Sequence, residues 1–532
     1  MIMNWKNFLR MSTFAVVALS VFAACSDSDD DPAPAPAPAD VVADAKLATF
    51  GFYKEDNPEY LTRDYVATVP EVVAGTTSYK VEIPMPSTVM KSMLVARFTV
   101  NEGNTVTVGN DRQSSGVTVN DFSADIEYFV KNLDNTQTLR YTISVVKATN
   151  MAWTESSALD VATLTGNAEF TGVYSGAVLK VSPKDNLPYV AFGARGVDNK
   201  LTVAKNVGGA WSLVGSPLFT SQVNGSHFDF DIAENGTPYV AYGDQDATSL
   251  KGALSVMKFD GSQWSNVGEQ GFFKVQAQYV GLTTVDDKVF TGMINNSASG
   301  DTPRRTLSVA NYEGGTWTTG ESSLLPSGQG VYMVKMGNNI TATLPVMISV
   351  NRGKVDNANY GHNVFYRDGG EWKALLTNYV QENATQTSIA AGSFGAISDL
   401  SGAIYVWTGD DADNTGNYQV RLRKYDQEAR AWSTVGGNTL PIGHDGGFES
   451  HLSLDIAIAP DGTPFVAFNN FKDGKKLYVM YLDPDTRQWT AAQQLAEGAD
   501  DVNIAFSSTG EGYITYTDGD NKIHIFKYAE RQ

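Results

Sequence analysis

The sequence predicts an all-β protein, in which an Ig-like β-sandwich is followed by a seven-bladed β-propeller closed by strand exchange. Three observations predict this class. Glycine is frequent, at 49 of 532 residues, and aromatic residues make up 11% of the chain. No long run with helical periodicity follows the N-terminal leader, and one motif recurs along the C-terminal part of the chain. Short β-rich segments separated by turns are typical of sandwiches and propellers.

Residues 1–24 have the pattern of a secretory signal peptide. Lys6 and Arg10 precede an apolar stretch at residues 11–24, which is shorter than the about 20 apolar residues of a transmembrane helix. The stretch ends at Cys25, the only cysteine of the chain, so no disulfide can form within it.

The same segment resembles a bacterial lipobox. Ala23 and Ala24 precede Cys25, although Phe22 stands where the family usually has an aliphatic residue. The resemblance implies that Cys25 is lipidated and becomes the first residue of the mature protein, so that a lipid anchor makes the membrane a partner. The alternative is an ordinary secreted protein with a stray cysteine.

Residues 25–45 are expected to form a tether. The acidic tract at residues 26–31 resembles the one that follows the lipidated cysteine in Bacteroidetes lipoproteins exported to the outer face of the cell. This resemblance implies an outer-membrane location facing the exterior; a solvated charged linker is the alternative. Residues 32–40 alternate proline and alanine, which favours an extended spacer of roughly 30 Å.

The charge of the chain argues against nucleic acid as a partner. Asp and Glu number 59 against 39 Lys and Arg, a formal net charge of −20, and no basic cluster is present. A net negative charge repels the phosphate backbones of nucleic acids.

We expect the protein to be a monomer.

Residues 46–148 are expected to form the first domain. Runs such as SYKVEIPMP and LRYTISVVKA alternate with turn residues, as in an Ig-like sandwich of roughly 100 residues. The order of these runs, and GVTVNDFS in particular, resembles an Ig-like domain of uncharacterised role that is common in Bacteroidetes surface lipoproteins. The resemblance implies a spacer, and no catalytic constellation lies within it.

Residues 151–532 carry an internal repeat. Residues 235–268 and 461–492 share a GTP turn, a YVA- or FVA-type strand, a polar loop, an alternating strand and a tryptophan that opens a fourth strand. Stacked four-stranded copies are typical of a propeller. The turns are similar to sialidase Asp-boxes, and EGGTW and DGGEW to kelch repeats, but the strand context differs in both, so neither activity is implied.

The regularly spaced tryptophans indicate the number of copies of the repeat. Six copies end with a tryptophan at spacings of 53 to 60 residues, and a seventh copy after Trp489 has only three strands. We expect the segment around Trp153 to supply its fourth strand, because this closes the ring without an exposed sheet edge. An aromatic at one fixed place packs each sheet against the next, so a structural role is expected. The repeat residues are Trp153, Trp211, Trp264, Trp317, Trp372, Trp432 and Trp489.

No catalytic motif is present. The sequence lacks G-x-S-x-G, H-E-x-x-H and a Walker loop. Without further cysteines, a zinc site would need histidine and carboxylate ligands, and the chain has five histidines. Neither a metal nor a cofactor is expected, and calcium in the acidic loops GDDADN and DGDNK is the one possibility left open.

Two histidines lie at similar points of the repeat. GSHFDFDIA and ESHLSLDIA place His227 and His451 where the innermost strand begins in the second and sixth copies. That end lies on the face that carries the loops between second and third strands. His451 and Glu449 could act as acid/base or metal groups, with His444 and Asp445 nearby. Repeat divergence, or hydrogen bonds along the axis, is the alternative.

The loops between second and third strands supply further candidates. Planar polar groups beside aromatic rings suit a sugar, because hydroxyl pairs match carboxylates and amides while C–H faces stack on rings. Trp407 could provide such a ring, although its place among sister copies, which we match to that of Phe192 and Tyr242, favours packing. The candidate ligand-binding residues are Arg195, His227, Asp244, Asp246, Trp407, Asp410, Asp411, His451, Asn469 and Asp518.

Three functions remain open. The first is a cell-surface lipoprotein that binds an extracellular ligand, a glycan or glycoconjugate, through the propeller face. The second is a protein-binding or adhesin propeller, and the third a glycan-active hydrolase or lyase. Fold alone does not separate them, because propellers host all three; the absence of a catalytic motif favours binding.

Overall fold

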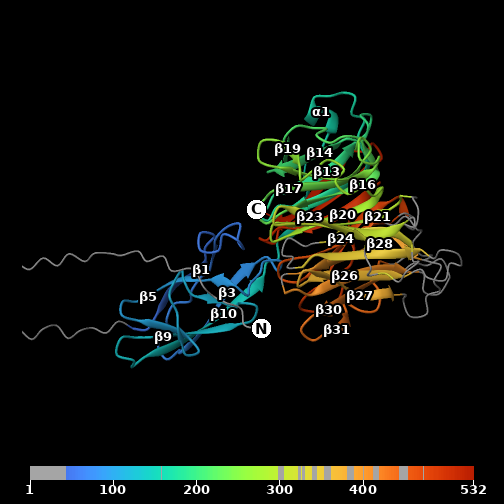
Figure 1. Ribbon diagram of the computed structural model, residues 1–532. Coiled ribbons are helices and arrows are strands. Elements are labelled where there is room, and N and C mark those ends of the chain that lie inside the picture. Colours follow the sequence, from blue (N-terminus) through green and yellow to red (C-terminus); the bar gives the residue numbers. More distant parts are fainter. Residues whose placement is uncertain are drawn as a thin grey trace, which may run out of the picture.

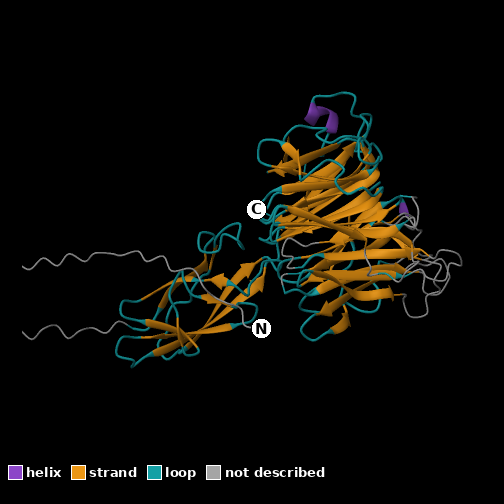
Figure 2. Ribbon diagram, viewed as in Figure 1, coloured by secondary structure: helices purple, strands orange, loops and turns teal. Residues whose placement is uncertain are grey.

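The chain is built almost entirely of β-strands, which confirms the predicted all-β class (Figure 2). The computed structural model describes residues 44–156, 158–297, 305–321, 325, 330–337, 344–352, 361–379, 389–399, 401–410, 419–442, 453–470 and 473–531. The expected leader and most of the tether lie outside these residues. In the described part, no helix is long and apolar enough to cross a membrane.

The first unit contains ten strands in three sheets. A three-stranded sheet has the order β2-β1-β5 and a five-stranded sheet the order β3-β10-β9-β6-β7, in which β3 and β10 are parallel; β4 and β8 form a short pair. The strands are β1 (Leu47–Phe52), β2 (Tyr65–Val66), β3 (Ser78–Met85), β4 (Leu94–Val95), β5 (Arg97–Val100), β6 (Thr105–Val108), β7 (Asp111–Arg112), β8 (Val119–Asn120), β9 (Ile126–Lys131) and β10 (Thr138–Lys147).

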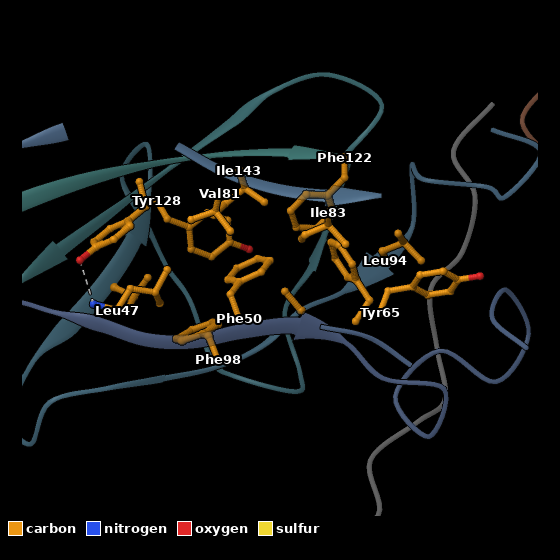
Figure 3. Packing of buried hydrophobic residues seen from close by; sticks show 14 of the residues in the cluster. Leu47, Phe50, Tyr65, Val81, Ile83, Leu94, Phe98, Phe122, Tyr128 and Ile143 are labelled. Carbon is orange, nitrogen blue, oxygen red and sulfur yellow. Dashed lines mark hydrogen bonds between the residues drawn. The ribbon is translucent and has the colours of Figure 1, made fainter. Parts of the chain in front are cut away.

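Alternating side chains of these two larger sheets form one aromatic core (Figure 3). Phe50 of β1 and Tyr128 of β9 lie with ring centroids 5.3 Å apart in an edge-to-face arrangement. The Tyr141 hydroxyl accepts a hydrogen bond from the Leu47 N–H at 3.2 Å. Burial of such rings is the main stabilising contribution available to a unit of this size.

The second unit contains seven four-stranded antiparallel sheets among the described residues. Sheets 1 to 3 are β12 (Val173–Val181), β13 (Pro188–Ala194), β14 (Leu201–Val207), β15 (Ala210–Leu213); β16 (Val223–Ile232), β17 (Pro238–Asp244), β18 (Ala253–Phe259), β19 (Trp264–Asn266); and β20 (Ala277–Val285), β21 (Lys288–Asn295), β22 (Thr306–Glu313), β23 (Thr316–Glu321).

Sheets 4 to 6 follow the same order along the chain. They are β24 (Gly330–Gly337), β25 (Val346–Arg352), β26 (His362–Asp368), β27 (Glu371–Tyr379); β28 (Ile389–Ser398), β29 (Ile404–Asp410), β30 (Gln419–Asp426), β31 (Ala431–Thr434); and β32 (Leu454–Ile458), β33 (Pro464–Asn470), β34 (Lys476–Tyr481), β35 (Gln493–Ala496).

Sheet 7 joins the two ends of the second unit. Its strands β36 (Asp500–Phe506), β37 (Gly512–Thr517) and β38 (Ile523–Glu530) are completed by β11 (Met151–Glu155). Trp153 pairs with Tyr528 across β11 and β38, which is the pairing expected from the sequence. A helical turn, α1 (Val161–Thr165), links this strand to sheet 1, and the Asp160 carboxylate caps it by accepting from the Thr163 N–H.

The first strand of each sheet, called here its inner strand, lies against the inner strand of the next. These contacts run from β12 through β16, β20, β24, β28 and β32 to β36, and β36 in turn contacts β12. The second strands, such as β13 and β17, are buried along their whole length. Such strands need apolar residues on both faces, which explains the continuous PYVAF-type runs.

Repeat tryptophans link each sheet to the preceding one. The Trp264 indole N–H donates to the Val214 carbonyl at 2.8 Å, and the Trp317 N–H donates to the Val267 carbonyl at 2.7 Å. The Trp317 ring also stacks on Phe272, with centroids 4.2 Å apart. These residues therefore act as inter-sheet contacts, the structural role expected of them.

The strand position predicted for Trp489 is wrong. The other five repeat tryptophans from Trp211 to Trp432 lie in the fourth strand of their sheet, but β35 begins four residues after Trp489, at Gln493. The hairpin before β35 widens here, and Trp489 forms only an isolated bridge to Leu482. The indole still packs on the preceding sheet, against Gly436.

The two units are in direct contact, with the first unit at one end of the inner strands (Figure 1). The resemblance implied a spacer, but these contacts also include a buried hydrogen bond from Thr88 Oγ1 to the Gly510 carbonyl at 2.7 Å. Further contacts join Ser508 with Glu59, Arg63 with Glu530, and Lys147 with Asp483.

The inter-sheet tryptophan contact can be tested at Trp317. We expect Trp317→Ala to lower the free energy of unfolding by about 3 kcal/mol, because a half-buried ring and its hydrogen bond are both lost. Trp317→Phe keeps a ring and loses the N–H donor, so about 1 kcal/mol is expected. Denaturant unfolding followed by circular dichroism measures both; equal losses in the two variants would contradict the packing role.

Candidate functional site

An axial cavity of about 1250 Å³ runs between the inner strands. All seven inner strands contribute to its wall. One end is covered by the first unit, where Pro58, Glu59, Tyr60 and Met90 line it. The other end, called here the mouth, lies where the inner strands begin. Since β16 begins opposite the end of β17, the mouth is on the face with the loops between second and third strands, as expected.

Charged residues lie at one level of this cavity. Asp229, Lys335 and Asp455 each line the wall. In their own sheets they pair with Ala241, Ile348 and Ala467, which are equivalent positions of the second strand. The three side chains therefore come from corresponding places in sheets 2, 4 and 6. The same position holds Val178, Gly281, Gly395 and Asn503 in the other sheets.

Both carboxylates bind backbone N–H groups of the neighbouring inner strand. Asp229 accepts from the Leu282 N–H at 2.8 Å, and Asp455 accepts from the Ile504 N–H at 3.0 Å. Their second oxygens accept from the N–H of the following residue. Each oxygen that accepts one N–H keeps a further lone pair for another donor.

Confinement changes the acidity of these groups. Burial raises the pKa of Asp229 to about 6, a rise that the positive charge of Lys180 partly offsets. Burial also raises the pKa of Asp455. The pKa of Lys335 is lowered by burial, against the opposing effect of Asp455 and Asp229. Burial therefore disfavours the charged form of each of these three side chains.

The Lys335 ammonium makes few stabilising contacts with the described part of the protein. It lies 4.8 Å from the ring centroid of Phe394. No hydrogen bond or ion pair to it is found within the described part of the chain. Lys180, another lysine of the cavity wall, by contrast lies 3.6 Å from an Asp231 oxygen. Lys335 is thus a donor that faces the cavity.

Bulges shape the mouth. The register between inner and second strand shifts near the start of the inner strand in sheets 1 to 5 and in sheet 7. A bulge re-aims side chains and is frequent beside functional sites. Tyr279, at the bulge of β20, has φ 46°, which is unusual for a residue with a side chain.

Four residues gather there, and we call them the mouth cluster: His227, Tyr279, Arg305 and Tyr332. The rings of His227 and Tyr279 have centroids 5.0 Å apart. The Arg305 guanidinium donates to the Val331 and Tyr332 carbonyls and lies 5.4 Å from the Tyr332 ring centroid. The cluster combines a cation, an imidazole and two phenols from sheets 2, 3 and 4.

His227 is held as a hydrogen-bond donor. Its Nδ1 accepts from the Tyr279 backbone N–H at 3.2 Å, which assigns the proton of the neutral ring to Nε2. Burial, and then the charge of Arg305, lower the pKa of His227. A neutral imidazole with its proton on Nε2 can donate a hydrogen bond from that atom, while its Nδ1 lone pair is already used.

Asp244 and Asn469 are buried and do not reach the surface of the mouth face. The Asp244 carboxylate accepts from Ser221, Ser255, Gln270 and the Asp246 N–H. Asn469 bridges two sheets, donating to the Ala499 carbonyl and accepting from the Ser453 N–H. Their polar groups are satisfied internally, so the structure gives both a loop-organising role instead of the predicted ligand contact.

Other predicted candidates are exposed or lie elsewhere. Arg195 and Asp246 are exposed on the mouth-side loops. Asp518 accepts from the Lys522 N–H and binds His524 Nε2 at 2.9 Å, and His524 also reaches Glu155 at 3.0 Å. This polar group belongs to the seam of sheet 7. It is separate from the mouth cluster.

The place predicted for Trp407 is wrong by one residue. Val406 and Trp407 pair as Val466 and Ala467 do, so Trp407 matches the alanine of sister sheets and not Phe468. The indole is 4% exposed and packs between sheets 5 and 6. It fits because its partner across the strands is Gly395, where a Cβ would meet the indole. Trp407 therefore packs between the sheets and also lines the axial cavity.

The predicted equivalence of His227 and His451 is also wrong. Ile232 pairs with Pro238 and Ile458 with Pro464, so the shared turn aligns His227 with Ser453. His451 itself, with His444 and Glu449, lies outside the described residues, as do Asp411 and Cys25. The backbone of Asp410 ends β29, but its side chain is not described.

No group of three or more His, Cys, Asp or Glu side chains in the described residues is arranged to hold a metal ion. In the loop DGDNK, Asp518 is occupied by backbone N–H groups and His524. Calcium in the loop GDDADN stays a prediction, because residues 411–418 are outside the described part.

The cavity residues Lys335, Asp229 and Asp455 and the mouth residues Tyr279, Arg305 and Tyr332 were missed by sequence reasoning. All of them except Arg305 lie on inner strands, whereas most of the candidates were predicted in the loops between second and third strands. A signal existed, since alignment on the GTP turn places Asp229 and Asp455 at one repeat position. Sheet 4 lacks that turn, so Lys335 could not be aligned.

No protein-family profile matches the sequence, and no curated protein matches it either. Solved structures with a similar fold include a PL25 polysaccharide lyase, ulvan lyase, bound to -[GlcA(1-4)Rha3S]- (13% identity over 68% of this chain and 96% of that one, TM-score 0.43). The polysaccharide lyase Uly1 (12%, 67% and 90%, TM-score 0.44) is another. The β-propeller domain of the Trilobed protease from Pyrococcus furiosus is a third (10%, 67% and 97%, TM-score 0.39). At these values, none of their activities is transferred to this chain.

The raised pKa of Asp229 predicts a pH dependence. The folded state binds this proton more tightly than the unfolded chain does, so the stability it contributes is present below about pH 4 and is lost as pH rises through about 6. Relative to wild type, Asp229→Asn should gain about 3 kcal/mol between these limits, from a shift of about two pKa units. Thermal unfolding from pH 4 to 7 measures it.

A matched control is Asp260→Asn. Hydrogen bonds from Gln263 and Ser262 lower the pKa of this exposed turn residue, so its effect lies below pH 4. Its difference from wild type should stay flat between pH 4.5 and 7. A flat profile for Asp229→Asn as well would contradict the confinement of that carboxylate.

Proposed function

We propose that this chain is a lipid-anchored cell-surface protein that binds an extracellular glycan or glycoconjugate at the mouth cluster. In this proposal the second unit is a closed seven-bladed β-propeller in which each four-stranded sheet is one blade. The first unit is an Ig-like domain that holds the propeller away from the membrane.

The mouth cluster is the observation that carries the proposal. Sugars need polar groups that pair with hydroxyls and ring faces that meet their C–H surfaces. His227 supplies a donor, Arg305 a cation, and Tyr279 and Tyr332 supply phenols with ring faces. Tyr332 is 37% exposed, so its ring is accessible. Few convergent polar groups with aromatics are the usual make-up of a small-ligand site.

The contacts between the units support a display role. The first unit lies against the covered end, and the chain reaches that unit from the predicted tether at residues 25–45. The mouth is then presented on the side away from the anchor. A ligand outside the cell would meet the mouth first.

An enzyme is the second candidate, because two carboxylates with raised pKa values lie in one cavity. A carboxyl group with a pKa of about 6, such as Asp229, suits a general acid. Two features weigh against it. Both carboxylates bind backbone N–H groups, and His227 carries its proton on Nε2. Release of reducing ends or unsaturated sugars from bound glycans would favour the enzyme.

A protein-binding role would need an apolar mouth face. Most of the exposed large apolar side chains in the described part belong to the first unit, including Val66, Val117 and Leu133. Among the mouth cluster only Tyr332 is of this kind. The described mouth therefore favours a polar ligand.

Loss of the mouth cluster should weaken glycan binding. We expect His227→Ala to lower the affinity for an array-identified oligosaccharide at least tenfold, about 1.4 kcal/mol, because a donor aimed at the ligand is removed. Isothermal titration calorimetry measures this. His524→Gln, at the seam of sheet 7, should bind as wild type does; silence of the wild-type protein across host, plant and microbial glycans would refute the function itself.

The anchor has its own test. We expect Cys25→Ser to move the protein from the membrane fraction to the soluble fraction and to abolish metabolic labelling with a fatty acid, because the serine hydroxyl does not replace the thiol in lipidation. Surface protease treatment of intact cells then reports which side of the membrane the anchored protein faces. Labelling that persists in the variant would show that Cys25 is not the lipidated residue.

A further inference from the structure

We infer that the axial cavity receives the uncharged end of a glycan chain, with Lys335 donating to its hydroxyls between the carboxylates of Asp229 and Asp455. This inference rests on the proposed glycan-binding function. It goes further by naming the charge of the ligand and the part of the ligand that is recognised.

The charged groups at this level are of mixed sign, within a described lining of seven carboxylates and three lysines. Lys335 repels a cation, while Asp229 and Asp455 at the same level repel an anion. A hydroxyl group both donates and accepts, so it can meet the ammonium and a carboxylate together. Both carboxylates keep lone pairs beyond those taken by backbone N–H groups. The chemistry that fits all three groups is a neutral polyol.

The covered end turns the cavity into a dead end. Pro58, Glu59, Tyr60 and Met90 of the first unit line that end, and the Glu59 carbonyl is held by the Ser508 hydroxyl at 2.8 Å. A chain that enters from the mouth meets these residues at the far end of the cavity. The volume of about 1250 Å³ exceeds the roughly 300–1,000 Å³ of small-ligand pockets, so a sugar terminus fits.

The fold itself does not need the Lys335 ammonium. The equivalent positions of sheets 1, 3 and 5 hold Val178, Gly281 and Gly395. A confined cation without a hydrogen-bond partner costs stability, whereas the aspartates serve the neighbouring strands. A role in ligand binding gives a reason for a lysine at this place.

The test compares chain ends with chain interiors. The mature full-length protein is titrated with neutral linear hexaoses of the malto, cello, laminari and xylo series, and each hexaose that binds is compared with its long polymer at equal mass. Recognition of ends predicts that the polymer competes more weakly in proportion to its fewer termini. Lys335→Met should lose affinity at least tenfold, and Lys335→Gln, which keeps a donor, should lose less.

Lys373→Met is the matched control, since Lys373 lies on an outer strand and pairs only with Asp368 at the surface. It should bind as wild type does, and circular dichroism should show both Lys335 variants folded. Unchanged affinity in Lys335→Met, equal competition per mass by polymer and hexaose, or binding only of acidic glycans overturns this inference while glycan binding stands. Failure of every glycan, neutral or acidic, removes both.

Discussion

Backbone N–H groups on the inner strands are the constraint on which the second unit depends. Each inner strand pairs with one strand only, so its other edge faces the axis without a ladder partner. A buried N–H without an acceptor is costly. Here side chains of the preceding sheet supply acceptors: Asp229 meets Leu282, and Asp455 meets Ile504. Neighbouring sheets are thus joined at their inner strands by side chain to backbone contacts and farther out by tryptophans.

This solution places charge inside the molecule. A carboxylate that reaches sideways to the next strand is buried and also lies beside the axial cavity. Its pKa rises in consequence, while burial lowers the pKa of Lys335 at the same level. The polar lining of the cavity is therefore first a consequence of joining neighbouring inner strands. A ligand that binds there uses groups that the fold already holds in place.

The features shared by all copies of the repeat were predicted from the sequence, whereas residues particular to one copy were missed. The class, the sheets and the pairing of Trp153 with the last strand follow from a pattern that recurs at nearly constant spacing. Register within a strand was less certain, because a one-residue slip changes the face of every side chain. Trp407 was misplaced in this way, and only its partner Gly395 shows why it packs. The bulge at Tyr279, whose ring contacts that of His227, has no signal that we recognised in the sequence.

The position of the first unit affects access to the axial cavity. As a flexible spacer it would leave the axial cavity a channel with two ends. Its buried contact between Thr88 and Gly510 holds it against one of them. The first unit then lies at the end of the cavity nearer the predicted anchor, and the mouth lies at the opposite end. Docking of a domain without any catalytic residue thereby decides from which direction, and by which end, a ligand reaches Lys335.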